Sequence, residues 1–367
     1  MKIALVQDWF VVNGGAEKIV KELVTLYPNA EVFGLVDFLN DQDRKDVLNG
    51  KRAKTSFLQQ LPFAAKGYRN FLPLFPKAIE GLDLSEFDLI ISSSYSVAKG
   101  LKREKGKQLH ICYCHSPIRY AWDLEREYLS HLSGLKKWIA KLTLAYIRKW
   151  DISTLDRVDF FIANSNFIAE RIKRIYGRDA AVIYPPVDTS SFIPVLVKEA
   201  YYFTSARMVA YKKLDLIVKA FEELPHLKLV VSGDGPEFEK LKKMATPNVV
   251  FTGFLTKNDL VTKMQRAKAF ILAAEEDFGI TSLEAQACAT PVIALRKGGY
   301  LETVLEGKTG CFFDEQNSKA ITEAVVDFEQ KNWNFKLEDF TNQVNRFSTV
   351  KFNQAISALI EEHVAKK

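Results

Sequence analysis

Disulfide frameworks, structural zinc sites and membrane-spanning helices all leave patterns that this sequence lacks. Its 367 residues include only four cysteines, which lie in apolar segments without Cys-x-x-Cys spacing: Cys112, Cys114, Cys288 and Cys311. That distribution favours buried thiols in a reducing compartment over disulfides or a zinc site. No apolar run approaches the roughly 20 residues that a membrane-spanning helix needs.

The first residues of the sequence also do not predict a secretion signal. The start, "MKIALVQDWF", has one lysine and a short β-like run, without a longer apolar stretch or a small-residue cleavage site. With 47% hydrophobic and 26% charged residues, the composition is that of a soluble globular protein. We therefore expect a cytoplasmic location.

Positive charge is concentrated in the first half of the chain. Residues 1–188 hold 28 Lys and Arg against 22 Asp and Glu, and the remainder holds 23 of each, so the first half carries the whole net charge of +6. Such an excess favours an anionic partner, either a membrane surface or a phosphorylated acceptor. No nucleic-acid-binding motif accompanies it, so no nucleic-acid partner is expected.

Apolar runs of strand length recur along the chain, each separated from the next by enough residues for a helix. They cover residues 2–6, 31–36, 87–92, 108–114, 158–163 and 180–184, then 201–205, 228–233, 248–253, 269–274, 291–295 and 310–313. Strands that are apolar on both faces belong to parallel sheets covered by helices. The sequence therefore predicts an α/β protein with two Rossmann-like, doubly wound βαβ domains.

The segment 184–200, "YPPVDTSSFIPVLVKEA", separates the two sets of runs. It contains three prolines and no helical period, as is typical of an interdomain linker. We expect one domain at 1–188 and a second at 189–346. Apolar residues at helical spacing predict a packed helix within 347–367, whose placement the spacing does not reveal.

Ligands of open parallel sheets bind at the carboxyl ends of the strands, so the residues after each run are candidates for a site. Gly14 and Gly15 precede a helix, where their N–H groups can approach a phosphate or sugar, although a tight turn also favours glycine. The absence of G-x-G-x-x-G disfavours a nicotinamide dinucleotide site. His115 follows the run 108–114 and is a functional candidate.

The other histidines carry no such signal. His110 lies inside a predicted strand and is expected to be packed or at its edge. His131, His226 and His363 have no motif around them and are expected on the surface.

Basic residues and glycines follow the runs of the second half. Arg207 follows the run 201–205, and Lys212 and Lys213 precede a helix. A guanidinium and an ammonium group there suit a diphosphate, whereas a lone lysine could equally be a solvated surface residue. Further loops contain Gly233, Gly235, Gly253 and Phe254. Such loops let a nucleobase and ribose lie against the main chain.

The stretch "AAEEDFGITSLEAQ" places Glu276 and Glu284 eight residues apart after the run 269–274. Thr281-x-x-Glu284 fits a capping box, in which Glu284 would have a structural role at the start of a helix. Capping does not account for Glu276, which remains a candidate for chemistry.

Together these segments resemble the retaining glycosyltransferases of family 4, which have the GT-B fold. "EEDFGITSLEAQACATPVIAL" is similar to the family's E-x7-E region, and further similar blocks are "NGGAEKIVKEL", "DLIISSSYSVAKG", "ICYCHSPIRYAWD", "FFIANSNFIAERI", "VIYPPVD" and "ARMVAYKKLDLI". "TSFLQQLPFAAKGYRNFLPLFPKAIE" with "CYCHSPIRYAWD" is most similar to the bacterial O-antigen mannosyltransferase branch.

The resemblance implies two Rossmann-like domains that face each other across a cleft. Residues 1–188 would bind the acceptor, residues 189–346 would bind the nucleotide sugar, and residues 347–367 would form a helix that crosses back to the N-terminal domain.

The resemblance also implies roles for the second half. Glu276 would bind hydroxyls of the donor sugar and Glu284 the ribose, while amides of Phe278, Gly279 and Ile280 would hold the sugar or its phosphate. Arg207 and Lys212 match the family's diphosphate pair. Two departures are Ala206 and Lys213, which stand where the family usually has glycine.

In the first half, His115 matches the family's histidine beside the sugar. Gly15 matches the glycine loop under the phosphates, with Gly14 beside it. Arg119 is assigned to the acceptor side.

The implied reaction is transfer of a hexose, α-mannose from GDP-mannose, with retention, in synthesis of a cell-surface polysaccharide or lipopolysaccharide. We favour same-face attack without a covalent nucleophile. No metal is expected, and Asp41-Gln42-Asp43, although similar to a metal-binding D-x-D, is expected to be a surface turn. A UDP-sugar-dependent family 4 transferase, a GT-B sugar-nucleotide epimerase and a non-catalytic binding module remain alternatives.

Two stretches of the first half bear on the acceptor. Residues 56–75 mix apolar, aromatic and basic side chains, and residues 134–150 place five apolar residues on one helical face beside lysines: Leu135, Trp138, Ile139, Leu142 and Tyr146. Such a helix can lie on an anionic membrane, although an ordinary core-facing helix would show the same pattern. We expect a lipid-linked acceptor and peripheral contact with the inner face of the plasma membrane.

Overall fold

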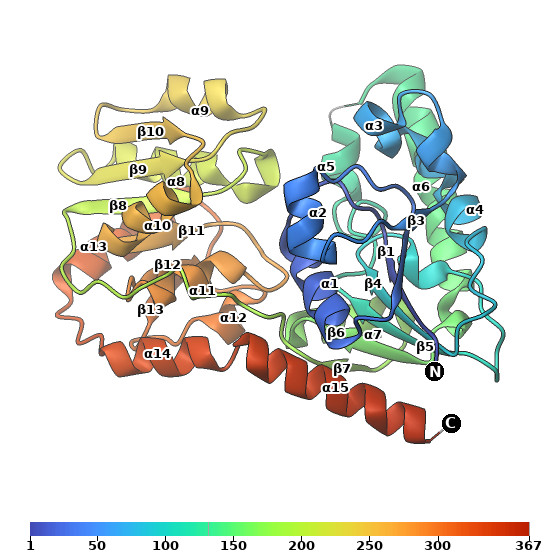
Figure 1. The fold of residues 1–367 in the computed structure, drawn as a ribbon. Helices are drawn as coiled ribbons and strands as arrows, with labels where there is room; N and C mark the ends of the chain where they lie inside the picture. The colour runs from blue at the N-terminus through green and yellow to red at the C-terminus, as the bar shows by residue number, and fades with distance from the viewer. Residues whose placement is uncertain (131, 367) are drawn as a thin grey trace. The chain divides into compact units, whose positions relative to one another are not determined.

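The computed structural model describes residues 1–130 and 132–366, so His131 and Lys367 lie outside the described residues (Figure 1). Contacts divide the chain into two compact units. The first comprises Met1–Pro186 with the described residues from Thr349 on, and the second is Val187–Ser348. The break after Pro186 falls inside the predicted linker, two residues before the predicted boundary.

The described part of the first unit contains a parallel sheet in the order β3-β2-β1-β4-β5-β6-β7. Its strands are β1 (Ile3–Gln7), β2 (Glu31–Gly34), β3 (Lys54–Thr55), β4 (Leu89–Ser94), β5 (Leu109–Cys114), β6 (Phe160–Ala163) and β7 (Ala180–Val182). Val6 pairs with Phe33 of β2 and with Ser92 of β4, so the strand order reverses at β1. The sequence missed only β3, whose two residues are too short for a periodic signal.

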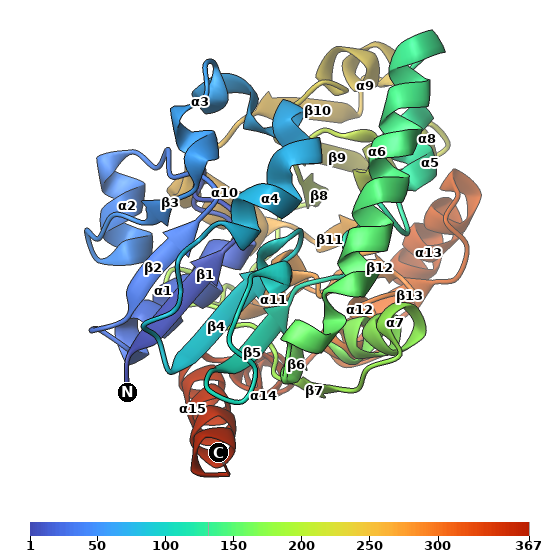
Figure 2. The ribbon, with the colours of Figure 1, turned by 90° about the vertical axis from the view of Figure 1, so that its right-hand side faces the viewer.

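Helices cover both faces of this sheet. They are α1 (Gly15–Leu26), α2 (Asp41–Leu48), α3 (Ala64–Gly67), α4 (Phe75–Glu80), α5 (Glu125–Ser130), α6 (Gly134–Ser153), α7 (Asn166–Tyr176) and α15 (Thr349–Ala365), with short 3₁₀ turns η1 (Phe57–Gln60), η2 (Tyr68–Leu74), η3 (Ala98–Gly100) and η4 (Leu155–Arg157). Ala4, Val6 and Ile90 share a core with residues of α4 and α6, and Figure 2 shows α6 to the right of β4 and β5. Leu5 and Ile91 point the other way and share a core with α1, α2 and α15. Alternating strand residues therefore build two apolar layers.

The C-terminal helix α15 belongs to the first unit. Phe352, Ile356 and Ile360 are buried in the same core as residues of α1. Asn353 donates to a carboxylate oxygen of Glu22 on α1 at 3.1 Å, and the ring of Phe352 lies 6.1 Å from that of Tyr113. The expectation that the last helix returns to the N-terminal domain is confirmed.

The second unit repeats the architecture. Its described sheet has the order β10-β9-β8-β11-β12-β13, with β8 (Tyr201–Ser205), β9 (Lys228–Ser232), β10 (Val249–Gly253), β11 (Ala269–Leu272), β12 (Val292–Leu295) and β13 (Gly310–Phe313). The helical elements are η5 (Ala210–Lys212), α8 (Leu214–Glu222), α9 (Phe238–Met244), α10 (Lys257–Arg266), α11 (Ile280–Ala287), α12 (Tyr300–Thr303), α13 (Ser318–Gln330) and α14 (Leu337–Asn345). Tyr202 of β8 pairs with both Leu229 and Ala269, so the strand order reverses at β8.

Local sequence accounts for many helix ends. Ser165, Thr256 and Asn317 precede α7, α10 and α13, and each side chain accepts from a backbone N–H of the first helical turn. Gly177 ends α7 in the left-handed conformation, with φ 63°, which glycine adopts without strain. The four cysteines are buried and free, as predicted.

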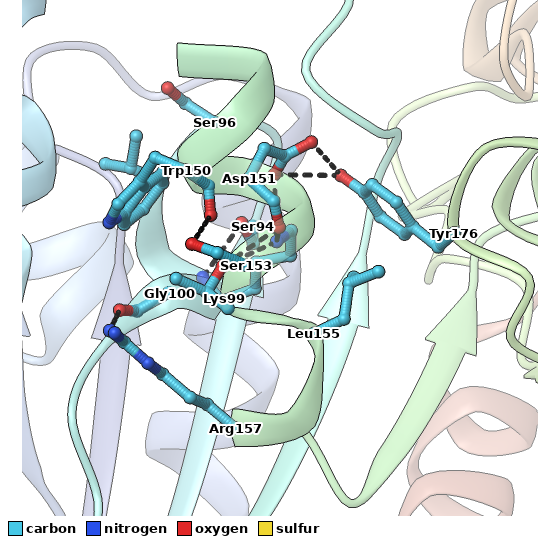
Figure 3. Close-up of polar contacts among 12 residues, drawn as sticks. Ser94, Ser96, Lys99, Gly100, Trp150, Asp151, Ser153, Leu155, Arg157 and Tyr176 are labelled. Carbon is cyan, nitrogen blue, oxygen red and sulfur yellow. Dashed lines mark hydrogen bonds and ion pairs between the residues drawn. The ribbon is translucent and has the colours of Figure 1, made fainter. Parts of the chain in front are cut away.

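A buried ion pair fixes the inner face of α6 (Figure 3). Lys99 Nζ lies 2.8 Å from Asp151 Oδ1 and donates to Thr154 Oγ1 at 3.1 Å, and both charged side chains are almost wholly excluded from solvent. Asp151 Oδ2 accepts from the hydroxyl of Tyr176 at 2.9 Å and from the indole of Trp122 at 2.8 Å. The network ties α6 to η3 and α7.

Among the helices of residues 1–130 and 132–366, none is both long and apolar enough to cross a membrane.

Candidate functional site

The carboxyl ends of β8 and β11 bring Lys212 and Glu276 together. Lys212 ends η5 after β8, and Glu276 lies in the loop after β11. Their side chains form an ion pair and are 24% and 20% exposed, so each stays accessible to a ligand. The sequence predicted each residue as part of a site but did not predict their direct contact, because they are 64 residues apart.

Arg207 stands two residues after β8 with an exposed side chain. Within the described chain, that side chain has no hydrogen bond or ion pair, whereas Lys212 is held by Glu276. The loop therefore presents one restrained cation and one unrestrained cation at the edge of the sheet. This arrangement suits a diphosphate. A guanidinium can donate two parallel hydrogen bonds to phosphate oxygens, and an ammonium group adds a compact positive charge.

Two glycines that the sequence analysis did not select support the loop of Glu276. The backbone N–H of Gly299 donates to the carbonyl of Glu276 at 2.8 Å. A Cβ on Gly298 would lie 2.3 Å from the same carbonyl oxygen, and one on Gly299 would lie 2.4 Å from the carbonyl oxygen of Phe278. Paired glycines at a strand end were the signal used for Gly14 and Gly15, and the same criterion applied after β12 would have found this pair.

The capping box predicted for Thr281 and Glu284 is wrong. The N-cap of α11 is Gly279, which has φ 86° and no side chain to accept a hydrogen bond. Thr281 is therefore the second residue of α11, and Glu284 lies in its second turn with a half-buried side chain. The chain enters the helix through a left-handed glycine, which a sequence pattern of Thr and Glu does not reveal.

The residues beside Glu276 are well anchored. Phe278 is buried, and its ring lies 5.4 Å from that of Phe347. A Cβ on Gly279 would lie 2.6 Å from the ring of Tyr300, so the loop passes close to α12. Ile280 is half-buried at the start of α11.

The glycine loops after β8, β9 and β10 interlock. Gly233 has φ 126°, and a Cβ there would lie 2.0 Å from the carbonyl oxygen of Ala206. Its N–H donates to the carbonyl of Gly253 at 2.9 Å. Phe254 is 81% exposed and provides an apolar surface at this edge. The loops predicted to hold a nucleotide thus lie together.

Lys213 has the backbone conformation of a glycine. Its φ of 54° and ψ of 32° are left-handed, and it precedes α8 directly. Lys213 therefore adopts a conformation that glycine reaches without strain and that strains a residue with a side chain.

In the first unit, Asp8 holds the loop that follows β4, at the edge of the sheet formed by the carboxyl ends of the strands. Its carboxylate follows β1 and accepts four backbone N–H groups, of residues 95–98 after β4, at 2.6 to 2.9 Å. Burial raises the pKa of Asp8 to about 6, although the four hydrogen bonds act in the opposite direction. The sequence analysis missed this residue, and the available signal was an acidic residue directly after the first strand.

Gly14 is the N-cap of α1, which begins at Gly15 as the sequence predicts. The carboxylate of Glu17 accepts from the N–H of Gly14 at 3.1 Å and from the amide of Gln7 at 3.3 Å. Glu17 is 3% exposed, and burial raises its pKa to about 7. The glycine loop is therefore held from beneath by a buried carboxyl group.

His115 lies after β5, where the sequence placed it. Its Nε2 is 2.8 Å from Ser93 Oγ, and its ring lies between those of Tyr95 and Tyr113, at 5.9 and 5.1 Å. Burial lowers the pKa of His115 to about 3, so the ring is neutral at neutral pH. A neutral imidazole can exchange hydrogen bonds with a sugar hydroxyl without adding charge.

Helix α7 holds the loop that follows His115. Arg171 donates to Ser116 Oγ at 3.0 Å and forms an ion pair with Asp123 at 2.7 Å. Arg119 lies between these two anchors, half-buried, with its carbonyl accepting from Leu124 at 2.7 Å.

The remaining candidates have structural positions. His110 is fully buried between Ser92 and the carbonyl of Arg157, which agrees with the prediction of a packed residue. His226 is exposed, as expected, but His363 is half-buried against Phe160.

Asp41 and Asp43 do not lie in a turn as predicted; they form the first turn of α2, where Asn40 caps Asp43. Acidic residues are favourable there because they face the positive end of the helix dipole. Within residues 1–130 and 132–366, no three His, Cys, Asp or Glu side chains are grouped to hold a metal ion.

Comparison with known proteins bears on both units. The family model described as Glycosyltransferase Family 4 matches residues 13–191, and the model described as Glycosyl transferases group 1 matches residues 188–346. A GDP-mannose-dependent alpha-(1-6)-phosphatidylinositol monomannoside mannosyltransferase of Mycolicibacterium smegmatis is 34% identical in an alignment of 194 positions, which covers 44% of this chain and 51% of the relative. The chain thus spans about half the length of the curated relatives it matches.

Solved structures match over the full length. The Anabaena protein HepE in complex with UDP has a TM-score of 0.72 at 18% identity, covering 99% of this chain and 100% of HepE. Sucrose-phosphate synthase of Thermosynechococcus elongatus has a TM-score of 0.75 at 17% identity, covering 100% of both chains. These likenesses show the GT-B fold that the sequence predicted. Because glycosyltransferase models match both halves of the chain, the protein belongs to the glycosyltransferases, and its N-terminal half matches the family 4 model.

Proposed function

We propose that the protein is a retaining hexosyltransferase that moves α-mannose from GDP-mannose onto a lipid-linked glycan in the synthesis of a cell-surface polysaccharide, such as an O-antigen or capsule. The observation that carries the proposal is the Lys212–Glu276 pair beside the exposed Arg207, at the ends of the strands where the second sheet reverses its order. Family membership supports glycosyl transfer. GDP-mannose is supported by the name of the mycobacterial relative.

In this proposal the two cations stabilise the leaving group. The bond between the anomeric carbon and the diphosphate breaks, and Arg207 and Lys212 offset the negative charge that develops. Glu276 binds hydroxyls of the sugar and Glu284 the ribose. The acceptor oxygen bonds to the anomeric carbon on the same face, and its proton passes to the departing phosphate, so configuration is retained. Trapping of a glycosyl adduct on Glu276 would contradict this route.

The reaction needs no metal ion in this proposal, because Arg207 and Lys212 provide the positive charge at the diphosphate. Turnover should be unchanged in EDTA. Loss of turnover in EDTA, with recovery on addition of manganese, would overturn this part.

The donor base is tested by thermal unfolding with GDP or UDP. A ligand at about 100 times its dissociation constant adds about 2.7 kcal/mol to stability. Stabilisation by GDP and not by UDP is expected. Stabilisation by UDP alone would show that the donor is a UDP sugar and not GDP-mannose. UDP is the nucleotide to compare because the structurally similar HepE was solved in complex with it.

The catalytic role is tested with Glu276→Ala. This variant should keep its stabilisation by GDP and lose about 10²- to 10³-fold in turnover, as expected when one group that stabilises the transition state is removed. Glu323→Gln, an exposed carboxyl on α13, is the matched control. Unchanged turnover in Glu276→Ala would exclude the assignment, and consumption of GDP-mannose without an acceptor would favour an epimerase.

A further inference from the structure

The outer face of α6 carries a continuous row of exposed apolar side chains. Leu135, Trp138, Ile139, Leu142 and Tyr146 are each between 48% and 70% exposed. At about 100° per residue they fall within a sector of about 100° around the helix axis. From Leu135 to Tyr146 the row extends about 17 Å along the helix, at 1.5 Å per residue. It is therefore a continuous strip, unlike the single apolar residues scattered over an ordinary surface.

The core-facing side of α6 is a different one. Leu144, Ile147 and Asp151 are buried, and Asp151 pairs on this side with Lys99 (Figure 3). By the same geometry the centre of this buried side is about 160° from the centre of the exposed row. The alternative that the five apolar residues form an ordinary core face is therefore wrong.

Lysines border the exposed row. Lys136, Lys141 and Lys149 are exposed, and none of them forms an ion pair with any residue that the structure describes. Residues 134–150 contain no Asp or Glu, and the buried Asp151 pairs with Lys99, so it does not neutralise these lysines. Arg148, by contrast, is held by Glu125 at 2.6 Å. The face is thus apolar at its centre and cationic at its edges.

We propose that the outer face of α6 docks in the interface of an anionic lipid bilayer. The apolar row enters the boundary between headgroups and acyl chains, and the lysines contact anionic headgroups. Trp138 and Tyr146 suit this depth because their rings are apolar with a polar edge. A second copy of the chain fits poorly, because a two-fold contact would bring the same lysines of both copies close together.

The proposal rests on α6 itself and adds to the proposed function a surface that would bring the enzyme to a lipid-linked acceptor. Its test does not depend on activity. The full chain is sedimented with vesicles of phosphatidylglycerol and phosphatidylcholine, and with vesicles of phosphatidylcholine alone. We expect binding to the anionic vesicles and a blue shift of tryptophan emission that Trp138→Ser abolishes.

Two variants separate the apolar and the charged contributions. Trp138→Ser with Leu142→Ser should weaken binding more than tenfold, because two large apolar side chains no longer enter the lipid. Replacing Lys136, Lys141 and Lys149 by Gln should weaken binding to anionic vesicles about a hundredfold, since each lysine near such a surface adds about a factor of five. All five positions are exposed, so the variants should unfold at the same temperature as the wild type.

The matched control is Val250→Ser with Leu301→Ser, at exposed apolar positions of the second unit. It should bind vesicles like the wild type. Failure of the wild type to bind anionic vesicles, or wild-type binding by the Trp138 and Leu142 variant, would overturn the proposal. A concentration-dependent dimer that this variant abolishes, without vesicle binding, would assign the face to a second copy instead. Each variant is also tested for stabilisation by GDP. A variant that loses vesicle binding but is still stabilised by GDP has lost the membrane contact and not the donor site of the proposed function.

Discussion

Lys213 has a left-handed backbone conformation, which is unfavourable for a residue that carries a side chain. A lysine at φ 54° is strained by about 1–2 kcal/mol, whereas glycine adopts this conformation freely but loses more entropy on folding. Lys213→Gly should therefore raise the free energy of unfolding by about 0.5–1 kcal/mol, measured by denaturant unfolding. Ala210→Gly in η5, where φ is ordinary, is the control and should lower it. A lower free energy of unfolding in both variants would show that Lys213 carries no backbone strain.

Glu17 makes stability depend on pH. Its pKa rises to about 7 in the folded state from an unfolded value of about 4.3, so its contribution is full below that lower value and is lost as the pH rises through 7. Asp8 acts in the same direction, whereas His110 and His115, with lowered pKa values, contribute stability that is lost as the pH falls. These effects offset one another in the wild-type profile.

The contribution of Glu17 is therefore measured as a difference. Between pH 5 and pH 8, the stability of Glu17→Gln should rise relative to that of the wild type, because the variant has no carboxyl group at position 17 to ionise. Denaturant unfolding across this range, with Glu323→Gln as an exposed control, measures it. A constant difference between the Glu17 variant and the wild type would show that Glu17 ionises normally in the folded protein.

At the scale of elements, one buried ion pair adds to the apolar packing that holds α6 in place. Asp151→Asn leaves Lys99 charged and unpaired, which costs about 3–5 kcal/mol of unfolding free energy. Replacing Lys99 by Met as well should restore part of the loss, because no uncompensated charge remains. The two single variants and the double variant form a cycle measured by denaturant unfolding. A loss of less than about 1 kcal/mol in Asp151→Asn would contradict a charged pair.

Sequence patterns predicted elements well where the signal was local and periodic. All twelve apolar runs contain strands. Most of these strands are buried on both faces and must therefore be apolar throughout, whereas β7 and β10 are partly exposed. The capping box of Thr281 failed because the real start of α11 depends on the left-handed Gly279. The pattern of α6 was found, but the same five residues would fit a core face or a free one, and only packing distinguishes them.

At the scale of the molecule, the C-terminal helix α15 belongs to the first unit, although the whole second unit lies between them in the sequence. Ile356→Ala should lower the stability of the first unit by about 2–5 kcal/mol, because a buried side chain of its core is lost. Hydrogen exchange of β1 and β4 should accelerate while that of β8 and β11 does not. Val350→Ala, at an exposed position of α15, should change neither. Equal acceleration in both sheets would show that the units unfold together.

The sequence by itself determined the two parallel α/β units and, next to their strand ends, the candidate residues Arg207, Lys212, Glu276 and His115. These follow from periodicity and from the residues next to each strand. The tertiary structure alone decided that Lys212 pairs with Glu276, that Asp8 binds the loop 95–98, that Gly298 and Gly299 support Glu276, and which face of α6 is exposed. Each of these contacts joins residues far apart in the chain, so it depends on the order of strands and on the packing of helices, which no local pattern encodes.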